Sequence, residues 1–145
     1  MSVLRAEPFN LLAGTVIIAK VQAYNIIGYS LPSEPNTGDA ELRTEPISPS
    51  TLVTRVDDGT TDTEIKVTYA LFTDDATTGY SPLISLDLWY DQGIDNWVSL
   101  HGGAPFYTLD TTFVVELLKP GQNYKFKYRG INIFGEGAFS AVSIV

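Results

Sequence analysis

The chain of 145 residues contains no cysteine, which excludes disulfides and metal sites built on thiolate ligands. It has nine lysine and arginine residues against 17 aspartate and glutamate residues, a net charge of −8. This balance argues against nucleic acid as a partner, because neutralising phosphates requires clustered basic side chains. No apolar run is long enough to span a bilayer, and no stretch has a helical apolar period. We therefore expect neither nucleic-acid binding nor membrane insertion.

The residues that are present favour short strands around a buried core. Hydrophobic residues make up 44% of the chain and charged residues 18%, unlike a disordered sequence. Residues 124–131 alternate between Tyr, Phe or Gly and mostly Lys or Arg, which is the period of a half-buried strand. Further short apolar segments, separated by turn residues, lie at 64–71, 83–91, 96–100 and 112–118. Short antiparallel strands at steady spacing predict a β-sandwich.

Two stretches of the chain, 11–33 and 118–140, resemble each other. Asn25 and Asn132 are 107 residues apart, and the same shift aligns Leu11 with Leu118, Gly14 with Gly121, Gly28 with Gly135 and Ser33 with Ser140. The apolar alternation stays in phase: Ile17, Ala19, Val21 and Ala23 align with Tyr124, Phe126, Tyr128 and Gly130. A shift close to the length of one domain indicates tandem modules.

The second stretch resembles the last strands of a fibronectin type III domain. The residues that match the order of that family's pattern are Leu118, Pro120, Gly121, Tyr124, Asn132, Gly135, Gly137 and Ser140. The resemblance implies an all-β, immunoglobulin-like antiparallel β-sandwich. It also implies that Tyr124 is a buried corner residue whose hydroxyl bonds to nearby backbone.

The resemblance also implies a division of the chain. Residues 46–145 would form a complete fibronectin type III domain, and residues 1–45 would be strands E, F and G of a preceding one. Strand E is expected within 1–10 and strand F within 14–25. The family's usual strand-B tryptophan is absent; Tyr69 lies near its place, and Trp89 is expected to supply the missing bulk. Alternatively, the half-domain is completed by another chain.

Candidates for chemistry are few, and we expect no catalytic residue, metal or cofactor. His101, the only histidine, lies in a predicted loop and is expected to be solvated. The acidic segments 57–64 and 73–75 suggest calcium ligands, but tight turns also favour Asp and Gly, and we prefer that interpretation. Asp91 and Asp95 are expected to bracket a turn rather than to act as a glycosidase pair.

Two phenylalanines near the predicted last turn, Phe134 and Phe139, are either core residues or an exposed apolar patch. We expect core, as for most aromatic residues beside a strand. The apolar residues of segment 1–45 would lack a covering sheet, so this segment is expected to be poorly ordered or to pair with a second copy in a homodimer.

The expected function is that of a non-catalytic module in a multi-domain chain. It would act as a spacer and as a protein–protein contact or adhesion unit, with neighbouring fibronectin type III domains and an unidentified protein as partners. The expected location is extracellular or on the cell surface. The alternatives are an accessory domain of a secreted carbohydrate-active enzyme, an intracellular scaffold module and, least favoured, a hydrolase that uses Asp91 and Asp95.

Overall fold

The computed structural model describes residues 2–38 and 40–145. Met1 and Asp39, which fall within the expected first segment, lie outside the described residues. The chain divides into two compact units, Met1–Arg43 and Thr44–Val145. The division lies two residues before the boundary expected from the sequence, which was placed after Glu45.

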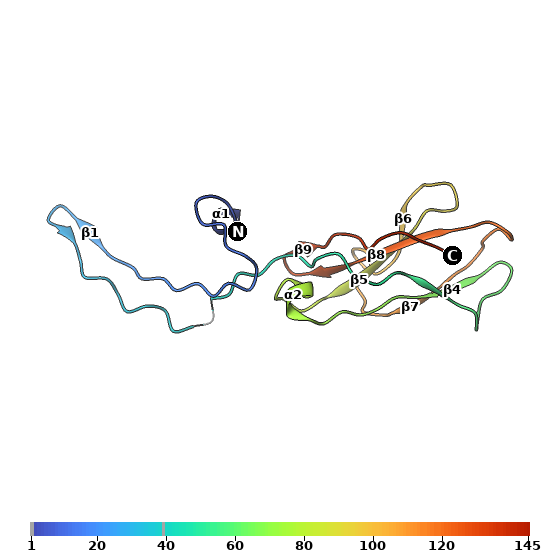
Figure 1. Cartoon of the computed structure of the whole chain (residues 1–145), viewed down its shortest axis with the longest axis horizontal. Helices are drawn as coiled ribbons and strands as arrows, with labels where there is room; N and C mark the ends of the chain where they lie inside the picture. The colour runs from blue at the N-terminus through green and yellow to red at the C-terminus, as the bar shows by residue number, and fades with distance from the viewer. Residues whose placement is uncertain (1, 39) are drawn as a thin grey trace. The chain divides into compact units, whose positions relative to one another are not determined.

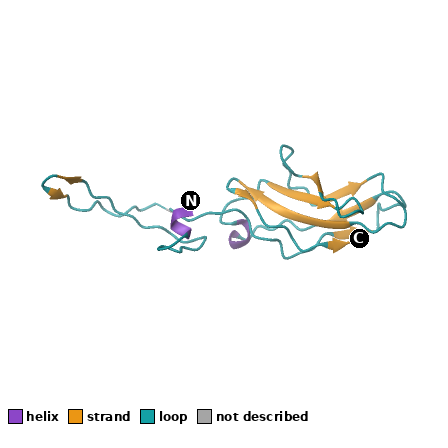
Figure 2. Cartoon of the chain, turned by 90° about the horizontal axis from the view of Figure 1, so that it is seen from above, coloured by secondary structure: helices purple, strands orange, loops and turns teal. Residues whose placement is uncertain are grey.

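The larger unit consists of two antiparallel sheets (Figures 1 and 2). One sheet has the order β3-β4-β7, formed by β3 (Thr54–Val56), β4 (Ile65–Thr68) and β7 (Thr112–Val115). The other has the order β10-β8-β5-β6, formed by β5 (Ser85–Tyr90), β6 (Val98–His101), β8 (Lys125–Asn132) and β10 (Ser143–Ile144), with β9 (Gly135–Glu136) paired to β8. The predicted immunoglobulin-like β-sandwich is confirmed.

Alternation along the strands builds the core between the two sheets. Leu86 and Leu88 of β5 and Phe126 and Tyr128 of β8 have no exposed surface, because even-numbered residues face inward. The buried residues that complete this cluster are Val53, Val67, Tyr69, Val115, Leu118 and Tyr124. Tyr69 packs on Tyr128 with ring centroids 5.2 Å apart, which places it in the core near the expected position.

The larger unit also has one short helix, α2 (Asp75–Thr78), where the sequence predicted only a turn. The Asp74 carboxylate accepts hydrogen bonds from the backbone N–H groups of Ala76 and Thr77, and so caps the helix. Gly79 ends it at φ +72°, and a Cβ there would lie 2.3 Å from the Thr44 carbonyl oxygen. A glycine is therefore required at this position.

The smaller unit begins with α1 (Ser2–Arg5) instead of the strand expected within residues 1–10. The N–H groups of Phe9 and Asn10 both bond to the Ala6 carbonyl, so this segment satisfies its backbone locally by a turn. Within the described ranges, neither helix of the chain is long or apolar enough to cross a membrane.

Residues 14–36 of the smaller unit form a long hairpin, which we call the arm. Only its tip is regular: β1 (Tyr24–Asn25) pairs with β2 (Gly28–Tyr29). The strand expected over 14–25 is otherwise absent, because the N–H groups of residues 19–23 that face the returning segment bond to its side chains instead of to its backbone carbonyls. Side-chain oxygens replace the backbone acceptors of the ladder: those of Ser30, Ser33 and Asn36 accept from the N–H groups of Ala23, Val21 and Ala19.

Candidate functional surfaces

The corner that precedes β8 is held by a tyrosine hydroxyl. Tyr124 is 4% exposed, and its Oη accepts a hydrogen bond of 2.8 Å from the Lys119 N–H. The turn between them passes through Pro120 and Gly121, where Gly121 has φ +74°, and Leu118 anchors its start in the core. The hydrogen bond ties the chain before β8 to the side chain that begins the strand.

At the opposite end of β8, the Asn132 side chain ties three segments together. Its amide nitrogen donates to the carbonyls of Thr44 (2.7 Å) and Thr78 (2.8 Å). Its oxygen accepts from the N–H groups of Phe134 (2.8 Å) and Gly135 (3.3 Å), closing the turn into β9. Asn132 is 2% exposed, so both polar atoms are satisfied inside the protein. The point where the chain enters the unit is thereby fixed to the turn after β8.

A row of cations and aromatic rings covers the outer face of the β8-β5-β6 sheet. The Lys127 ammonium lies 4.1 Å from the ring centroid of Trp97 and 4.3 Å from that of Phe139. The Arg129 guanidinium lies 4.6 Å from Phe139 and 5.7 Å from Trp89. Cations over ring faces are attracted to the ring quadrupole. Burial, and secondarily the charge of Arg129, lowers the pKa of Lys127.

The carboxylate of Asp87 lies beneath this row and is 1% exposed. It accepts hydrogen bonds from Arg129 Nε (2.9 Å), Trp89 Nε1 (2.7 Å) and Ser99 Oγ (2.7 Å). A buried carboxylate with three donors, one of them a cation, is a satisfied charge. Glu136, at 2.7 Å from Arg129 Nη1, provides a second carboxylate.

These contacts alter three expectations from the sequence. Trp89 does not fill the core, because odd-numbered residues of β5 face outward. The two phenylalanines expected in the core lie outside it as well: Phe139 is half-buried in the row, and Phe134 is 39% exposed. Sequence reasoning missed the row itself. The sequence does contain a sign of it: the odd-numbered positions of the two strands β5 and β8, which lie on one face of the sheet, are occupied by Asp87, Trp89, Lys127 and Arg129.

The remaining candidates for chemistry have structural neighbours. His101 lies in β6 rather than in a loop, 3.2 Å from the Asp110 carboxylate. Asp91 is 2% exposed, and its Oδ1 accepts from the N–H groups of Gly93 and Lys125. Asp95 pairs with the Lys125 ammonium. Within the described ranges, no three His, Asp or Glu side chains are grouped to hold a metal ion.

The carboxylate-rich segment 57–64 connects β3 to β4. Thr60 stabilises the connection: its N–H bonds to the Asp57 carbonyl, its hydroxyl donates to the Val56 carbonyl, and it accepts from the Lys66 N–H. The backbone of this turn is therefore held by a threonine.

The arm repeats the hydrogen bonds of the hairpin that contains β8 and β9. In the larger unit, the Tyr128 N–H bonds to Ser140 Oγ at 3.1 Å, and the Ser140 N–H bonds to the Tyr128 carbonyl at 2.7 Å. In the arm, 107 residues earlier, Val21 and Ser33 make the same two bonds at 3.0 and 2.8 Å. The repeat seen in the sequence is thus a repeat of backbone geometry.

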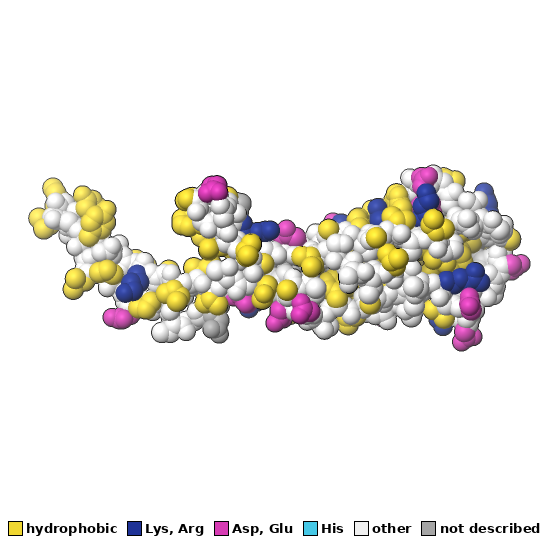
Figure 3. Space-filling view, viewed as in Figure 1, with side chains coloured by type: hydrophobic (Ala, Val, Ile, Leu, Met, Phe, Trp, Pro, Cys, Tyr) yellow, Lys and Arg dark blue, Asp and Glu magenta, His cyan; other side chains and the backbone are white. Residues whose placement is uncertain are grey.

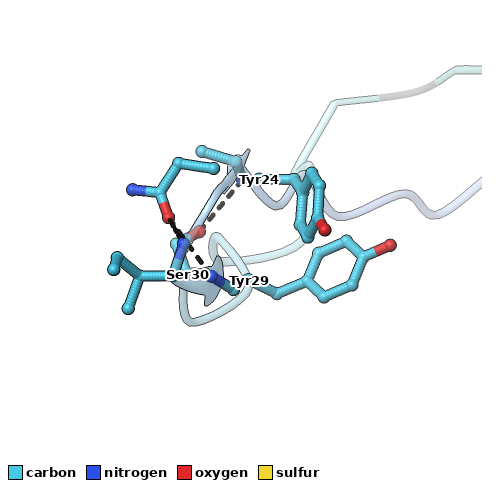
Figure 4. A pocket seen from close by; sticks show the side chains of 7 residues that line it. Tyr24, Tyr29 and Ser30 are labelled. Carbon is cyan, nitrogen blue, oxygen red and sulfur yellow. Dashed lines mark hydrogen bonds between the residues drawn. The ribbon is translucent and has the colours of Figure 1, made fainter.

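The turns of the two hairpins agree as well. The oxygens of the Asn25 and Asn132 side chains each accept from the N–H groups two and three residues ahead. Gly28 and Gly135 follow with φ of +144° and +149°, a conformation that favours glycine. Figure 4 shows the arm's tip, where the Tyr24 and Tyr29 rings lie side by side with centroids 4.7 Å apart.

The two hairpins differ in what covers them. Apolar side chains of the arm are exposed, including Ile18 (73%), Val21 (73%), Tyr24 (70%) and Ile26 (97%). Figure 3 shows hydrophobic atoms gathered at the arm's tip. Contiguous exposed apolar patches of this kind are typical of interaction sites.

The fold of the larger unit defines the class, an immunoglobulin-like β-sandwich module. A crystal structure of domains A168-A170 from titin is similar at a TM-score of 0.58 and 18% identity, over 90% of this chain and 40% of that chain. Titin kinase and its flanking domains are similar at a TM-score of 0.54 and 18% identity, over 70% of this chain and 17% of that chain. The chain thus spans less than half the length of either structure. No family model matches the sequence, and no curated protein matches it significantly.

Proposed function

We propose that the chain is a non-catalytic fibronectin type III module that acts as a spacer and protein–protein contact unit in a multi-domain, secreted or cell-surface protein. The type III assignment is supported by the ordered residues from Leu118 to Ser140 and by the corner bond of Tyr124. Its partners would be neighbouring modules of the same type and a further protein. Surface biotinylation of cells that make the protein tests the location, and exclusive labelling after lysis would contradict it.

The observation that carries the spacer role is the position of the two ends of the larger unit. The chain enters at Thr44, which bonds to Gly79 and to Asn132 at the end of β8. At the other end of the unit, the N–H and carbonyl of Val145 bond to Tyr124, just before β8 begins. The eight residues of β8 separate the two points by about 26 Å at the rise of a strand. Tension along the parent chain would therefore pass along the sandwich.

Stretching single molecules of the full chain by its two ends tests this role. We expect one cooperative unfolding step for the unit 44–145, with a length gain of about 30 nm for roughly 100 residues. The arm has no core and should extend without a step. The variant Asn25→Ala, in the exposed turn of the arm, is the matched control and should leave the force of the step unchanged. Smooth extension without any step would contradict a mechanical role.

A further inference from the structure

One edge of the arm has no neighbour. Within residues 2–38 and 40–145, the backbone groups of Ile18, Lys20 and Gln22 make no hydrogen bond, since the odd-numbered residues between them face the returning segment. Tyr24 continues this alternation. We call residues 18–24 the open edge.

The open edge has the geometry of a paired strand. The residues 107 positions later, Lys127, Arg129 and Ile131, are the ones that face β5, opposite Trp89, Asp87 and Ser85. Because the two hairpins share their internal bonds, the open edge presents its N–H and carbonyl groups as β8 presents them to β5. An antiparallel strand can therefore be added there without rearrangement of the arm.

The opposite edge of the arm is blocked. Pro32 and Pro35 remove two N–H donors from the returning segment, and prolines on an edge prevent further pairing. An arm with a single open edge forms a closed pair instead of a growing sheet.

Charge selects the occupant. From Pro8 to Ser33 the only charged side chain is Lys20, in a chain of net charge −8. Two copies repel each other through this net charge, whereas the open edge offers an apolar strand without carboxylates, where they meet with the least repulsion. Edge strands are usually protected by several charges, and this one has a single lysine.

We propose that the open edge pairs antiparallel with the open edge of a second copy, about a two-fold axis at Val21. This inference rests on the contact role proposed above and names its surface. This register places Ile18 opposite Tyr24 and Lys20 opposite Gln22. All four residues of each copy whose backbone groups point away from the arm are therefore paired. An axis at Lys20 would oppose two lysines, which is destabilising, and an axis at Gln22 would run the pairing into the turn.

Single cysteines test this register in the full chain, which has no cysteine of its own. Val21 faces Val21 of the second copy in a non-hydrogen-bonded pair, with a Cα separation of about 4.5 Å, within the range of a disulfide. Val21→Cys should therefore form a covalent dimer as the main product of mild oxidation. Ala19→Cys and Ala23→Cys should cross-link poorly alone and well when mixed, because each faces the other.

A second test introduces either a negative or a positive charge at residue 22 and measures the dimerisation of the full chain by sedimentation. Gln22→Glu places a carboxylate opposite Lys20 twice per dimer and should tighten dimerisation by roughly threefold or more. Gln22→Lys should weaken it by a similar factor. The glutamate variant loses the exposed bond from Gln22 Nε2 to the Ser30 carbonyl, which works against the expected tightening.

Equal effects of both charges, or a monomeric chain that Val21→Cys does not cross-link, would overturn the pairing. The latter result would assign the edge to a strand of another module. A monomer whose larger unit still unfolds in one mechanical step would leave the spacer role intact. Conversely, a cross-linked dimer that extends smoothly would contradict the spacer role alone.

Discussion

The arm and the hairpin of β8 and β9 contain the same turn and the same backbone bonds, yet only the second is a strand over its length. β8 has a paired strand on each side and a core beneath Phe126 and Tyr128. The arm has apolar residues at the same positions without a covering sheet. The comparison shows that Asn, Gly and Ser at fixed spacing determine the turn and register, while neighbouring strands determine whether a regular strand forms.

The largest expected effect concerns the carboxylate beneath the outer face of β8, which has no counterpart in the arm. Asp87→Ala leaves Arg129 without its buried partner and the Trp89 and Ser99 donors unpaired. We expect a loss of about 3–5 kcal/mol in the free energy of unfolding, measured by urea denaturation.

The control for this variant is Asp95→Asn, which removes the exposed charge opposite Lys125 but keeps a residue type suited to the φ of +58° at this position, and it should leave the denaturation curve unchanged. Similar losses in both variants would mean that the burial of Asp87 has no energetic consequence.

The second prediction compares the two equivalent asparagines. Asn132→Ala leaves the carbonyls of Thr44 and Thr78 and two N–H groups without partners, and should cost about 2–4 kcal/mol. Asn25→Ala removes only bonds within an exposed turn and should not change the melting of the larger unit. Thermal unfolding of both variants checks this, and an equal effect would contradict the stabilising role of the Asn132 hydrogen bonds.

These residues also show how much the sequence predicts. The alternation in 124–131 and the turn signals were sufficient for the sandwich and the placing of its strands, and the 107-residue shift predicted that the two hairpins correspond. The outer face of β8 was missed, because its contacts join Asp87, Trp97 and Phe139, which are distant in sequence. Strand pairing in the arm was overestimated, since local alternation does not report whether a neighbouring strand exists.

The third prediction concerns the corner, where Ile17 of the arm aligns with Tyr124. Tyr124→Phe keeps the buried ring but leaves the Lys119 N–H without an acceptor, and should cost about 1–3 kcal/mol. Tyr90→Phe is the matched control: the Tyr90 ring stacks on Tyr124, and its hydroxyl makes no hydrogen bond within the described ranges. A thermal melt in which both variants match the unsubstituted chain would exclude a stabilising corner bond.

The smallest expected effect is electrostatic: the stability of the larger unit should depend on the ionisation of Asp110, whereas the arm should not respond to it. The pKa of Asp110 is lowered from 3.8, first by its hydrogen bond with the Thr108 side chain and then by His101. A lowered pKa in the folded state means that the ionised carboxylate adds stability above pH 3.8, and that this contribution is lost as the pH falls through the folded-state pKa. The melting temperature of the unsubstituted chain should therefore exceed that of Asp110→Asn at neutral pH, and the two melting temperatures should converge in acid.

An NMR titration of the Asp110 carboxyl measures this pKa directly. Thr108→Val should return the pKa toward 3.8 by more than His101→Gln does, because the Thr108 hydrogen bond is the larger cause. Residues 14–33 of the arm contain no carboxylate side chain, so their resonances give an internal reference over the same pH range. Arm resonances that followed the titration of Asp110 would show that the two units are coupled, and a pKa at or above 3.8 would remove the stabilising role of the Thr108 bond.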